Sequence, residues 1–443
     1  MSVRRITIEN LRGIDSFTLT EQPSDASGAP WIILLGENGV GKSTVLRGLA
    51  FALAHKNVVG GVLARSRAPW CRNGTTAATI TVETSLDAFR AVLSRTNGHT
   101  EVEQEREVEP PFVVAYGCKR GARLRPRARG EPGARLQRRD ALRGDRRRSA
   151  PASHRVTRRK LAEQQEEDPD GEAHHILAAV VAVLCGPPDA RGHGLLEGVT
   201  DIEIGGDDVK LRGEAIGDVP IEALSDGYIT MMGWTVDLMA RWIEARRTAK
   251  LGVPRRFNEA MTGVVLIDEI DLHLHPRWQY EVIERVRSFF PRLTFVVTTH
   301  NPMTLLRARP GEVHVLRREG GQTAVHTVDV PQGVRADELL TGLWFGLTST
   351  TDPQTLALYE EHQRAIRGGT SFGDPSLREL EAELRRRLKR FGDTSLERIA
   401  HNALAAMPRP ARGEPSPEQR AAMLDHVKAT LAREAGARSV GEK

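Results

Sequence analysis

A nine-residue glycine-rich segment constrains the fold of this chain more than any other feature. It reads Gly36-Glu37-Asn38-Gly39-Val40-Gly41-Lys42-Ser43-Thr44, after a short apolar run at residues 31–35 and before an apolar-periodic stretch at residues 45–55. A strand, a glycine-rich loop and a helix in this order predict a phosphate-binding loop. A chance glycine-rich turn is the alternative, but the spacing, the Lys-Ser pair and both flanks favour the loop.

The chemistry of such a loop makes all nine residues candidate contacts of ATP. Glycines allow successive backbone N–H groups to face one anion, and the helix that begins near Lys42 adds its positive N-terminal end. Lys42 is placed to reach the β- and γ-phosphates, and the Ser43 hydroxyl to ligate Mg²⁺. The sequence therefore predicts a nucleoside triphosphatase that uses ATP and Mg²⁺.

Two acids follow an all-apolar segment at residues 263–267. An acid at the end of a buried strand is costly without a partner, and Mg²⁺ held by the phosphates and Ser43 supplies one. We expect Asp268 to hold this metal ion and Glu269 to act as the general base on the attacking water. The alternative is a pair of acids that cap a strand in solvent.

A shorter motif, Leu224-Ser225-Asp226-Gly227, lies between the phosphate loop and the two acids. By itself it is weak, because Ser225 or Asp226 could simply cap the helix that follows. Its position at a predicted helix start favours a binding role, since a serine hydroxyl and a glycine N–H there can hold a γ-phosphate.

The bulk composition indicates a protein without membrane segments. No run of about 18 apolar residues occurs. The N-terminus runs directly into strand-like alternation, so we expect no signal peptide. The three cysteines, Cys71, Cys118 and Cys185, have no metal-like spacing, which favours a reducing, cytoplasmic setting.

The net charge of +5 comes from one segment of the chain. Residues 118–160 hold 17 Lys and Arg against 3 Asp and Glu, a local net charge of +14, and the rest of the chain carries a net charge of −9. A generally basic nucleic-acid binder is therefore excluded. The segment itself is either a basic arm for phosphate backbones, a disordered insertion, which we favour because it cannot bury enough apolar surface, or an out-of-frame reading of a GC-rich gene.

We expect an α/β fold in four segments: residues 1–116 with the phosphate loop, an Arg-rich insertion at 117–171, residues 172–330 with the two acids, and a helical region at 331–443. Alternating stretches predict an N-terminal hairpin and an antiparallel layer after the first helix, with a turn at Asn97-Gly98. Apolar periodicity predicts further helices at 172–185, 228–246, 276–290, 355–366, 375–391, 396–406 and 417–435.

The order of these motifs resembles the ABC-type ATPase heads of the SMC, RecF and OLD group. It looks closest to the AAA-family ATPases of bacterial phage-defence operons, of which the Septu (PtuA) type is one. The resemblance covers roughly residues 1–330, with a gap at the Arg-rich segment. It is carried by the phosphate loop and by four further motifs: Asn10-Leu11-Arg12-Gly13, Leu224 to Tyr228, Leu266 to Pro276, and Thr298-Thr299-His300-Asn301-Pro302.

This resemblance implies a P-loop NTPase of the ABC-head type that dimerises head to tail around two ATP molecules. Ser225 and Gly227, with Asp226 between them, would face the phosphate loop of the other subunit. Asp271 would lie in the loop that communicates across the dimer, and His300 would contact the γ-phosphate. The alternatives for His300 are a histidine that ends a strand in a loop, or a zinc site with His273 and His275.

The chain departs from the family pattern in two respects. Where the family usually carries a coiled-coil or helical arm, this sequence has Arg-rich text without heptads, and no glutamine can be assigned to the loop that links ATP to the partner domain. No nuclease-like acid cluster follows residue 330. The resemblance therefore implies a homodimer or higher oligomer with a separate effector, a nuclease, and DNA or a phage product as trigger.

Three rival functions stay open at this point. One is a RecF-like DNA-repair ATPase without a toxic effector, and a second is a transport ATPase subunit. The third is a degenerate scaffold that binds nucleotide without turnover, which the intact Glu269 speaks against and the Arg-rich interruption speaks for.

Overall fold

The computed structural model describes residues 2–21, 31–63, 69–96, 99–117, 171–190, 192–205, 208–213, 216–368, 370 and 374–387. The Arg-rich insertion, the Asn97-Gly98 turn and the two last predicted helices lie outside these residues. The chain separates into two compact units, Met1–Gly346 and Leu347–Lys443, which are described one at a time. The division into four segments at residues 1–116, 117–171, 172–330 and 331–443 stays a prediction.

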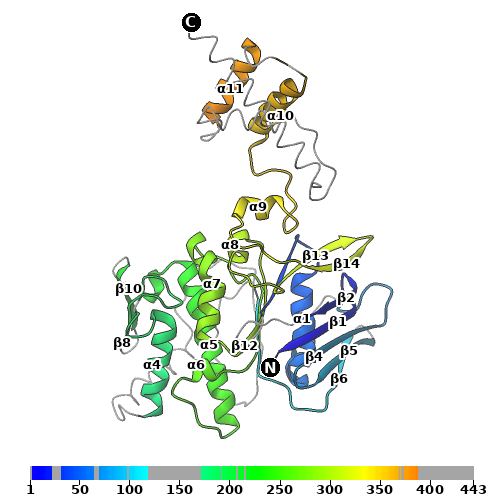
Figure 1. The fold of residues 1–443 in the computed structure, drawn as a ribbon. Coiled ribbons are helices and arrows are strands. Elements are labelled where there is room, and N and C mark those ends of the chain that lie inside the picture. Colours follow the sequence, from blue (N-terminus) through cyan, green and yellow to red (C-terminus); the bar gives the residue numbers. More distant parts are fainter. Residues whose placement is uncertain are drawn as a thin grey trace. The chain divides into compact units, whose positions relative to one another are not determined.

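A six-stranded sheet forms the centre of the first unit (Figure 1). Its strand order is β14-β13-β3-β12-β11-β7, and all neighbours are parallel except the β13–β14 hairpin. Strands that are buried on both faces read as continuous apolar runs, which explains why β3, β11 and β12 carry almost no polar residue. The bounds are β3 (Trp31–Gly36), β7 (Val113–Tyr116), β11 (Gly263–Ile267), β12 (Leu293–Thr298), β13 (Val313–Glu319) and β14 (Gln322–Thr327).

An antiparallel sheet and helix α1 (Lys42–Leu53) cover one face of the central sheet. This sheet has the order β2-β1-β4-β5-β6, so the N-terminal hairpin pairs directly with strands that come after α1. Ile32 and Leu34 of β3 point into this layer. Its elements are β1 (Val3–Leu11), β2 (Ile14–Thr20), β4 (Ala77–Thr84), β5 (Ala88–Thr96), β6 (His99–Glu105) and helix α2 (Lys56–Leu63).

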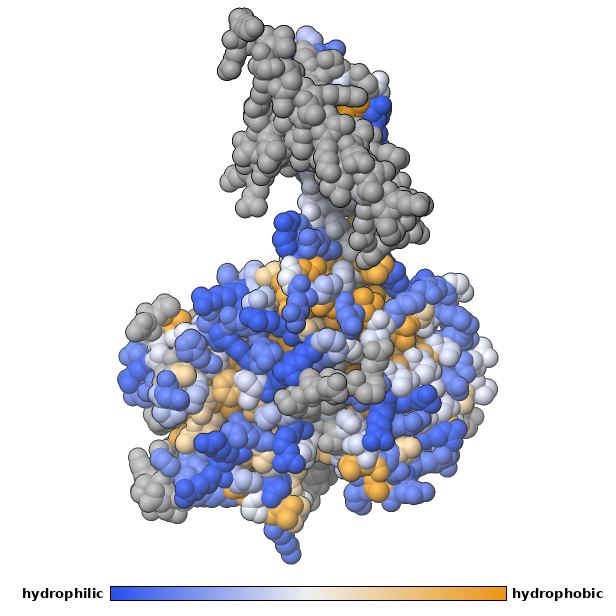
Figure 2. Space-filling view, viewed as in Figure 1, coloured by the Kyte–Doolittle hydropathy of each residue, from blue (hydrophilic) through white to orange (hydrophobic). Residues whose placement is uncertain are grey.

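Helices cover the opposite face, where Trp31, Ile33 and Leu35 of the same strand point. The alternation follows from the two-residue period of a strand, and Figure 1 shows α4, α5 and α7 on this side of the sheet. The elements are α4 (Glu172–Cys185), the small antiparallel sheet of β8 (Asp201–Gly205), β9 (Asp208–Gly213) and β10 (Gly217–Pro220), α5 (Asp226–Thr248), α6 (Phe257–Ala260), α7 (Pro276–Phe289), α8 (Pro302–Leu305) and α9 (Ala336–Thr341). In Figure 2 the visible face of this unit is mostly hydrophilic, as expected when both faces of the sheet are covered.

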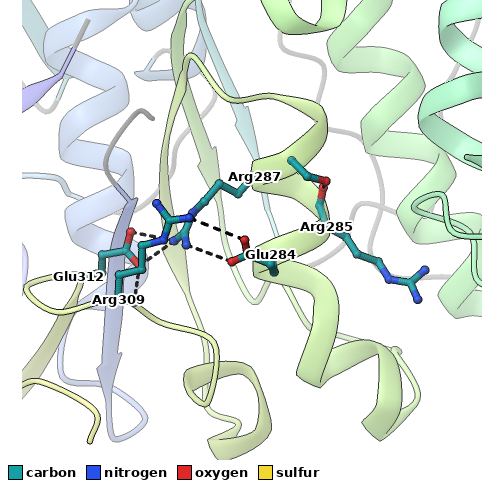
Figure 3. A network of polar contacts seen from close by, with 6 residues as sticks. Glu284, Arg285, Arg287, Arg309 and Glu312 are labelled. Atoms are coloured by element: carbon teal, nitrogen blue, oxygen red, sulfur yellow. Dashed lines mark hydrogen bonds and ion pairs between the residues drawn. The ribbon is translucent and has the colours of Figure 1, made fainter. Parts of the chain in front are cut away.

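A buried ion pair ties α7 to the segment before β13 (Figure 3). Nη2 of Arg287 donates to both carboxylate oxygens of Glu312, each at 2.7 Å, and the backbone N–H of Arg309 donates to the same carboxylate at 2.8 Å. Arg287 and Glu312 are 5% and 7% exposed. Because each charge compensates the other in a place with little water, removal of one partner costs about 3–5 kcal/mol. The backbone carbonyl of Glu312 also accepts from the N–H of Ile33, which joins this network to the central sheet.

The second unit contains the helix pair α10 (Pro353–Arg367) and α11 (Pro375–Arg387). Asp352 caps α10 by accepting from the N–H of Thr355, and Pro353 occupies the first turn, where its missing N–H costs nothing. Leu377 and Leu384 of α11 are buried. Within the described residues, no helix in either unit is long and apolar enough to cross a membrane.

The sequence prediction of an α/β fold with an antiparallel layer is confirmed, and most element bounds agree to within a few residues. Five short elements were missed: α2, β10, the 3-10 turn at Ile221–Ala223, α6 and α8. Each is eight residues or fewer, too short for a periodic apolar pattern to stand out. We call Leu224-Ser225-Asp226-Gly227 the signature motif and α5, which starts within it, the signature helix. This helix begins two residues before the predicted start, at Asp226.

We predict that His314 makes the fold sensitive to acid. Burial lowers the pKa of His314 to about 4, below the value of about 6.5 for an exposed histidine. Between these values the unfolded chain binds a proton that the folded chain does not, so stability falls as the pH drops, by at most about 1.4 kcal/mol per pH unit.

His314→Leu should remove this part of the slope, measured as urea unfolding free energy between pH 7 and 4.5. The exposed His326→Leu on the neighbouring strand β14 is the matched control and should keep the wild-type slope. Equal slopes in wild type and His314→Leu would contradict the prediction.

Candidate nucleotide-binding site

The candidate site lies where three neighbouring parallel strands end. β3 leads into the glycine-rich loop, β11 into Asp268 and Glu269, and β12 into Thr299 and His300. Because β12 lies between β3 and β11, the carboxyl ends of all three strands meet at one edge of the sheet. Ligands of open α/β sheets bind at such an edge.

The lysine of the glycine-rich loop donates hydrogen bonds to backbone carbonyls at the start of the same loop. Nζ of Lys42 donates to the backbone carbonyls of Gly36 at 2.7 Å and Glu37 at 2.8 Å, and the side chain is buried. Burial lowers the pKa of Lys42 to about 8, and the carboxylates of Asp268 and Glu269 oppose that shift. The loop therefore holds a buried cation at the start of α1, where an anionic ligand would be its natural partner.

Gly41 is required at the junction of loop and helix. It precedes α1 with a φ of +115°, and a Cβ there would approach Ile14 of the N-terminal hairpin to 3.1 Å. Its carbonyl accepts from the N–H groups of Thr44 and Val45 and so starts the helix. The first turn of α1 itself contains no acidic residue, and acids there would compete with an anionic ligand for the positive end of the helix.

The predicted metal ligands are in direct contact. Oγ of Ser43 lies 2.8 and 3.0 Å from the two carboxylate oxygens of Asp268, although the residues are 225 positions apart in the chain. A hydroxyl and a carboxylate beside a phosphate loop are the protein oxygens that Mg²⁺ uses in P-loop proteins. The residues present therefore fit Mg²⁺ with ATP.

Thr298 organises the two acids, and sequence reasoning assigned it no role. Its hydroxyl donates to Oδ1 of Asp268 at 2.8 Å and accepts from the N–H of Glu269 at 2.7 Å. Its carbonyl accepts from the N–H of Ile270 at 3.1 Å, and its side chain is fully buried. The available signal was a hydroxyl at the last position of a strand that is mostly apolar.

Glu269 adopts a strained backbone conformation. Its φ is +54°, in the left-handed region that side chains with a Cβ rarely occupy. Such strain persists only where surrounding contacts enforce it, and it gathers at functional sites. Here Thr298 enforces it from the neighbouring strand.

His300 lies close enough to Lys42, Asp268 and Glu269 for their charges to affect its pKa. Desolvation, followed by the Lys42 ammonium, lowers the pKa of His300, and Glu269 and Asp268 oppose the shift. The imidazole still keeps exposed surface at the end of β12. A neutral ring can donate to an anion with one nitrogen.

The signature motif is at the start of α5, and its two ends differ. Ser225 is the residue before the helix, is exposed, and makes no side-chain capping bond, so the capping alternative is not supported for it. Gly227 is buried, and a Cβ there would come within 2.7 Å of the His273 carbonyl. In the described part of the chain, no hydrogen bond or ion pair connects Ser225, Asp226 or Gly227 to the phosphate loop.

Asp271 is 7% exposed in the turn between β11 and α7. His273 in the same turn has a φ of +67°, and His275 caps α7 by accepting from the N–H of Arg277. Across the described residues, no three His, Cys, Asp or Glu side chains form a group that could hold a metal ion. The zinc alternative therefore has no support.

Part of the chain matches a known protein family, and most of it aligns with a curated relative. Residues 203–306 match the family described as "AAA domain, putative AbiEii toxin, Type IV TA system". The Septu protein PtuA of Bacillus mycoides (strain KBAB4) is 28% identical over 372 residues, which cover 79% of this chain and 45% of that protein. The Retron Ec83 probable ATPase of Escherichia coli is 45% identical over 80 residues, 18% of this chain and 14% of that protein.

The predicted resemblance is thus confirmed: residues 203–306 match an AAA-domain family, and Septu and retron ATPases are among the proteins to which this chain is similar. It spans less than half the length of these curated relatives. Among solved structures, an SMC head bound to the C-winged helix domain of ScpA aligns with 74% of this chain and 98% of its own, at 11% identity and a TM-score of 0.46.

We predict that Thr298→Val disturbs the site without removing a predicted ligand. Loss of a residue that orients a metal ligand should weaken Mg²⁺-dependent nucleotide binding about 10–100-fold. The buried N–H of Glu269 would also lose its partner, which costs about 1–3 kcal/mol of stability.

Titration with a fluorescent ATP analogue, with and without Mg²⁺, measures the first effect and urea unfolding the second. Thr298→Ser keeps the hydroxyl and should bind as wild type does. A Thr298→Val protein with wild-type affinity would show that the hydroxyl does not organise the site.

Proposed function

We propose that this protein binds and hydrolyses ATP with Mg²⁺ and works as a nucleotide-driven switch. The observation that carries the proposal is the direct contact of Ser43 with Asp268 beside the buried Lys42. These three groups come from distant parts of the chain and converge on one sheet edge. A structural role alone does not explain a buried ammonium, a hydroxyl–carboxylate pair and a strained acid at the same place.

Each residue would have a distinct task. Lys42 and the N–H groups of the loop bind the phosphates, while Ser43 and Asp268 hold Mg²⁺, which neutralises charge on the transferred phosphoryl group. Glu269 orients the attacking water and accepts its proton. Thr298 keeps both acids in register, and His300 donates to the γ-phosphate.

We further propose that two copies close around ATP. Ser225 has an exposed hydroxyl that its own helix does not use, and Gly227 brings the start of α5 against the turn that follows Glu269. Within the described residues, the motif makes no hydrogen bond or ion pair with its own phosphate loop, which supports a role on the loop of a second copy. In this arrangement Asp271 lies in the turn that would report on the other site.

Our proposal for the cellular role of this protein is based on the proteins to which it is similar. The names of the similar proteins refer to Septu and retron systems, and we propose that this chain likewise senses infection in the cytoplasm in an antiphage system. The effector would be a separate nuclease, with DNA or a phage product as trigger. A RecF-like repair ATPase is the alternative, which strong, salt-sensitive DNA binding by the protein alone would favour.

The first test is steady-state ATP hydrolysis by the purified protein, with and without single- and double-stranded DNA. Wild type should turn over ATP, Lys42→Ala should neither bind ATP nor dimerise, and Glu269→Gln should bind ATP and remain a closed dimer by light scattering. If Glu269→Gln hydrolyses ATP as wild type does, the assignment of the base is wrong. A wild type that binds no nucleotide would overturn the proposal.

The second test asks whether the sites are shared between copies. Lys42→Ala and Ser225→Arg should each be inactive. A mixture should regain activity, because a mixed dimer contains one site with an intact loop and an intact signature. Mixing Lys42→Ala with Glu269→Gln is the matched control and should regain none, since both changes remove the loop side. Activity that does not return in the first mixture would exclude shared sites.

A further inference from the structure

Tyr116 connects two parts of the proposed site that are far apart in the chain. It is the last residue of β7, the strand beside β11. Its backbone carbonyl accepts from the N–H of Asp268 at 2.9 Å, so β7 helps to hold the predicted metal ligand. Its hydroxyl points away from that edge and donates to Oδ2 of Asp237 at 2.9 Å.

Asp237 belongs to the signature helix. It lies about three turns after the start of α5, and Nε of Arg241 donates to the same carboxylate oxygen at 2.6 Å. The side chain of Asp237 is 16% exposed, so water competes little for this oxygen. One carboxylate therefore receives both the tyrosine and the arginine.

The tyrosine ring is held as firmly as its hydroxyl. It packs against Trp234 of α5, with the ring centroids 6.1 Å apart, and Trp234 is 2% exposed. Burial, with the Asp237 carboxylate adding to it, raises the pKa of Tyr116 well above its usual range. A protonated tyrosine hydroxyl is a hydrogen-bond donor, as in its bond to the Asp237 carboxylate.

We propose that Tyr116 is a positioning residue that transmits the state of the metal-binding end of β11 to the signature helix α5. The inference rests on the proposed function, because it assigns a consequence to nucleotide binding at Lys42 and Ser43. A movement of Asp268 on binding shifts the carbonyl of Tyr116, and the rigid ring passes this shift to Asp237. Ser225 and Gly227 lie at the start of α5. The nucleotide bound to one copy would therefore affect the position of the signature motif that this copy presents to its partner.

The arrangement explains why the link runs through a tyrosine. A tyrosine side chain has only two rotatable bonds, so a displacement at its backbone reaches the hydroxyl nearly undiminished, whereas a long flexible side chain would absorb it. Energetic coupling between sites is carried by packed side chains and hydrogen bonds. The bond between Tyr116 and Asp237 supplies such a connection within a single copy.

The test measures hydrogen exchange along α5 in the full-length protein, with and without ATPγS and Mg²⁺. The measurement is made in Ser225→Arg, which removes the contribution of a partner's nucleotide to α5, so any response is transmitted within one chain. Nucleotide should change the exchange of α5 amides several-fold. Adding Tyr116→Phe should abolish this response while the affinity for ATPγS changes little.

Matched variants separate coupling from simple destabilisation. Tyr280→Phe, on α7, removes a hydroxyl that makes no hydrogen bond within the described residues and should keep the response. Asp237→Leu removes the bond from Tyr116 together with the bond from Arg241, so it should lose the response as Tyr116→Phe does. The double variant should lose no more of the response than Asp237→Leu alone, because the bond between Tyr116 and Asp237 is already absent. Asp237→Asn keeps an acceptor oxygen and should restore the response in part.

The outcomes distinguish this inference from the proposed function. If ATPγS binds but α5 does not respond, or if Tyr116→Phe responds as its parent does, the role of Tyr116 is overturned and the ATPase proposal stands. If the wild-type protein never dimerises with ATP, the dimer proposal fails. The exchange response within one chain still decides the role of Tyr116. In the otherwise wild-type chain, Tyr116→Phe should lower kcat with little change in nucleotide affinity.

Discussion

The parallel pairing of β3, β12 and β11 is the constraint on which the rest of the structure depends. Parallel strands must be covered on both faces, and the antiparallel layer with α1 and the helical layer with α5 and α7 supply the two covers. The same pairing brings the carboxyl ends of the strands together. A phosphate loop, two acids and a threonine therefore meet at one edge, although 225 positions separate Ser43 from Asp268.

Polar groups in the site are arranged so that each depends on its neighbours. Thr298 bonds to Asp268, Glu269 and Ile270, so the strained backbone of Glu269 is held from a different strand. Lys42 has its pKa lowered by burial and is bonded to carbonyls of its own loop. The chain thus maintains a buried lysine beside a hydroxyl–carboxylate pair, and the proposed phosphoryl transfer would need such preorganisation.

The signature helix α5 is attached to this edge twice within one copy. Gly227 packs against the carbonyl of His273, in the turn that follows Glu269, and Asp237 accepts from Tyr116, whose carbonyl holds Asp268. These contacts would connect the start of α5 with the edge of the sheet where Asp268 and Glu269 lie. In the proposed dimer that dependence would relate the two nucleotide sites, since Ser225 would serve the other copy.

The glycine-rich loop, the two acids and the alternation of layers could be predicted from the residues alone, because local spacing and apolar period report directly on strands, loops and helices. Three features appear only in the folded chain: the hydrogen bonds of Thr298, the bond from Tyr116 to Asp237 and the close approach of Gly227 to His273. Each joins residues on different elements, and which strands become neighbours depends on packing of the whole sheet. No local pattern encodes that choice.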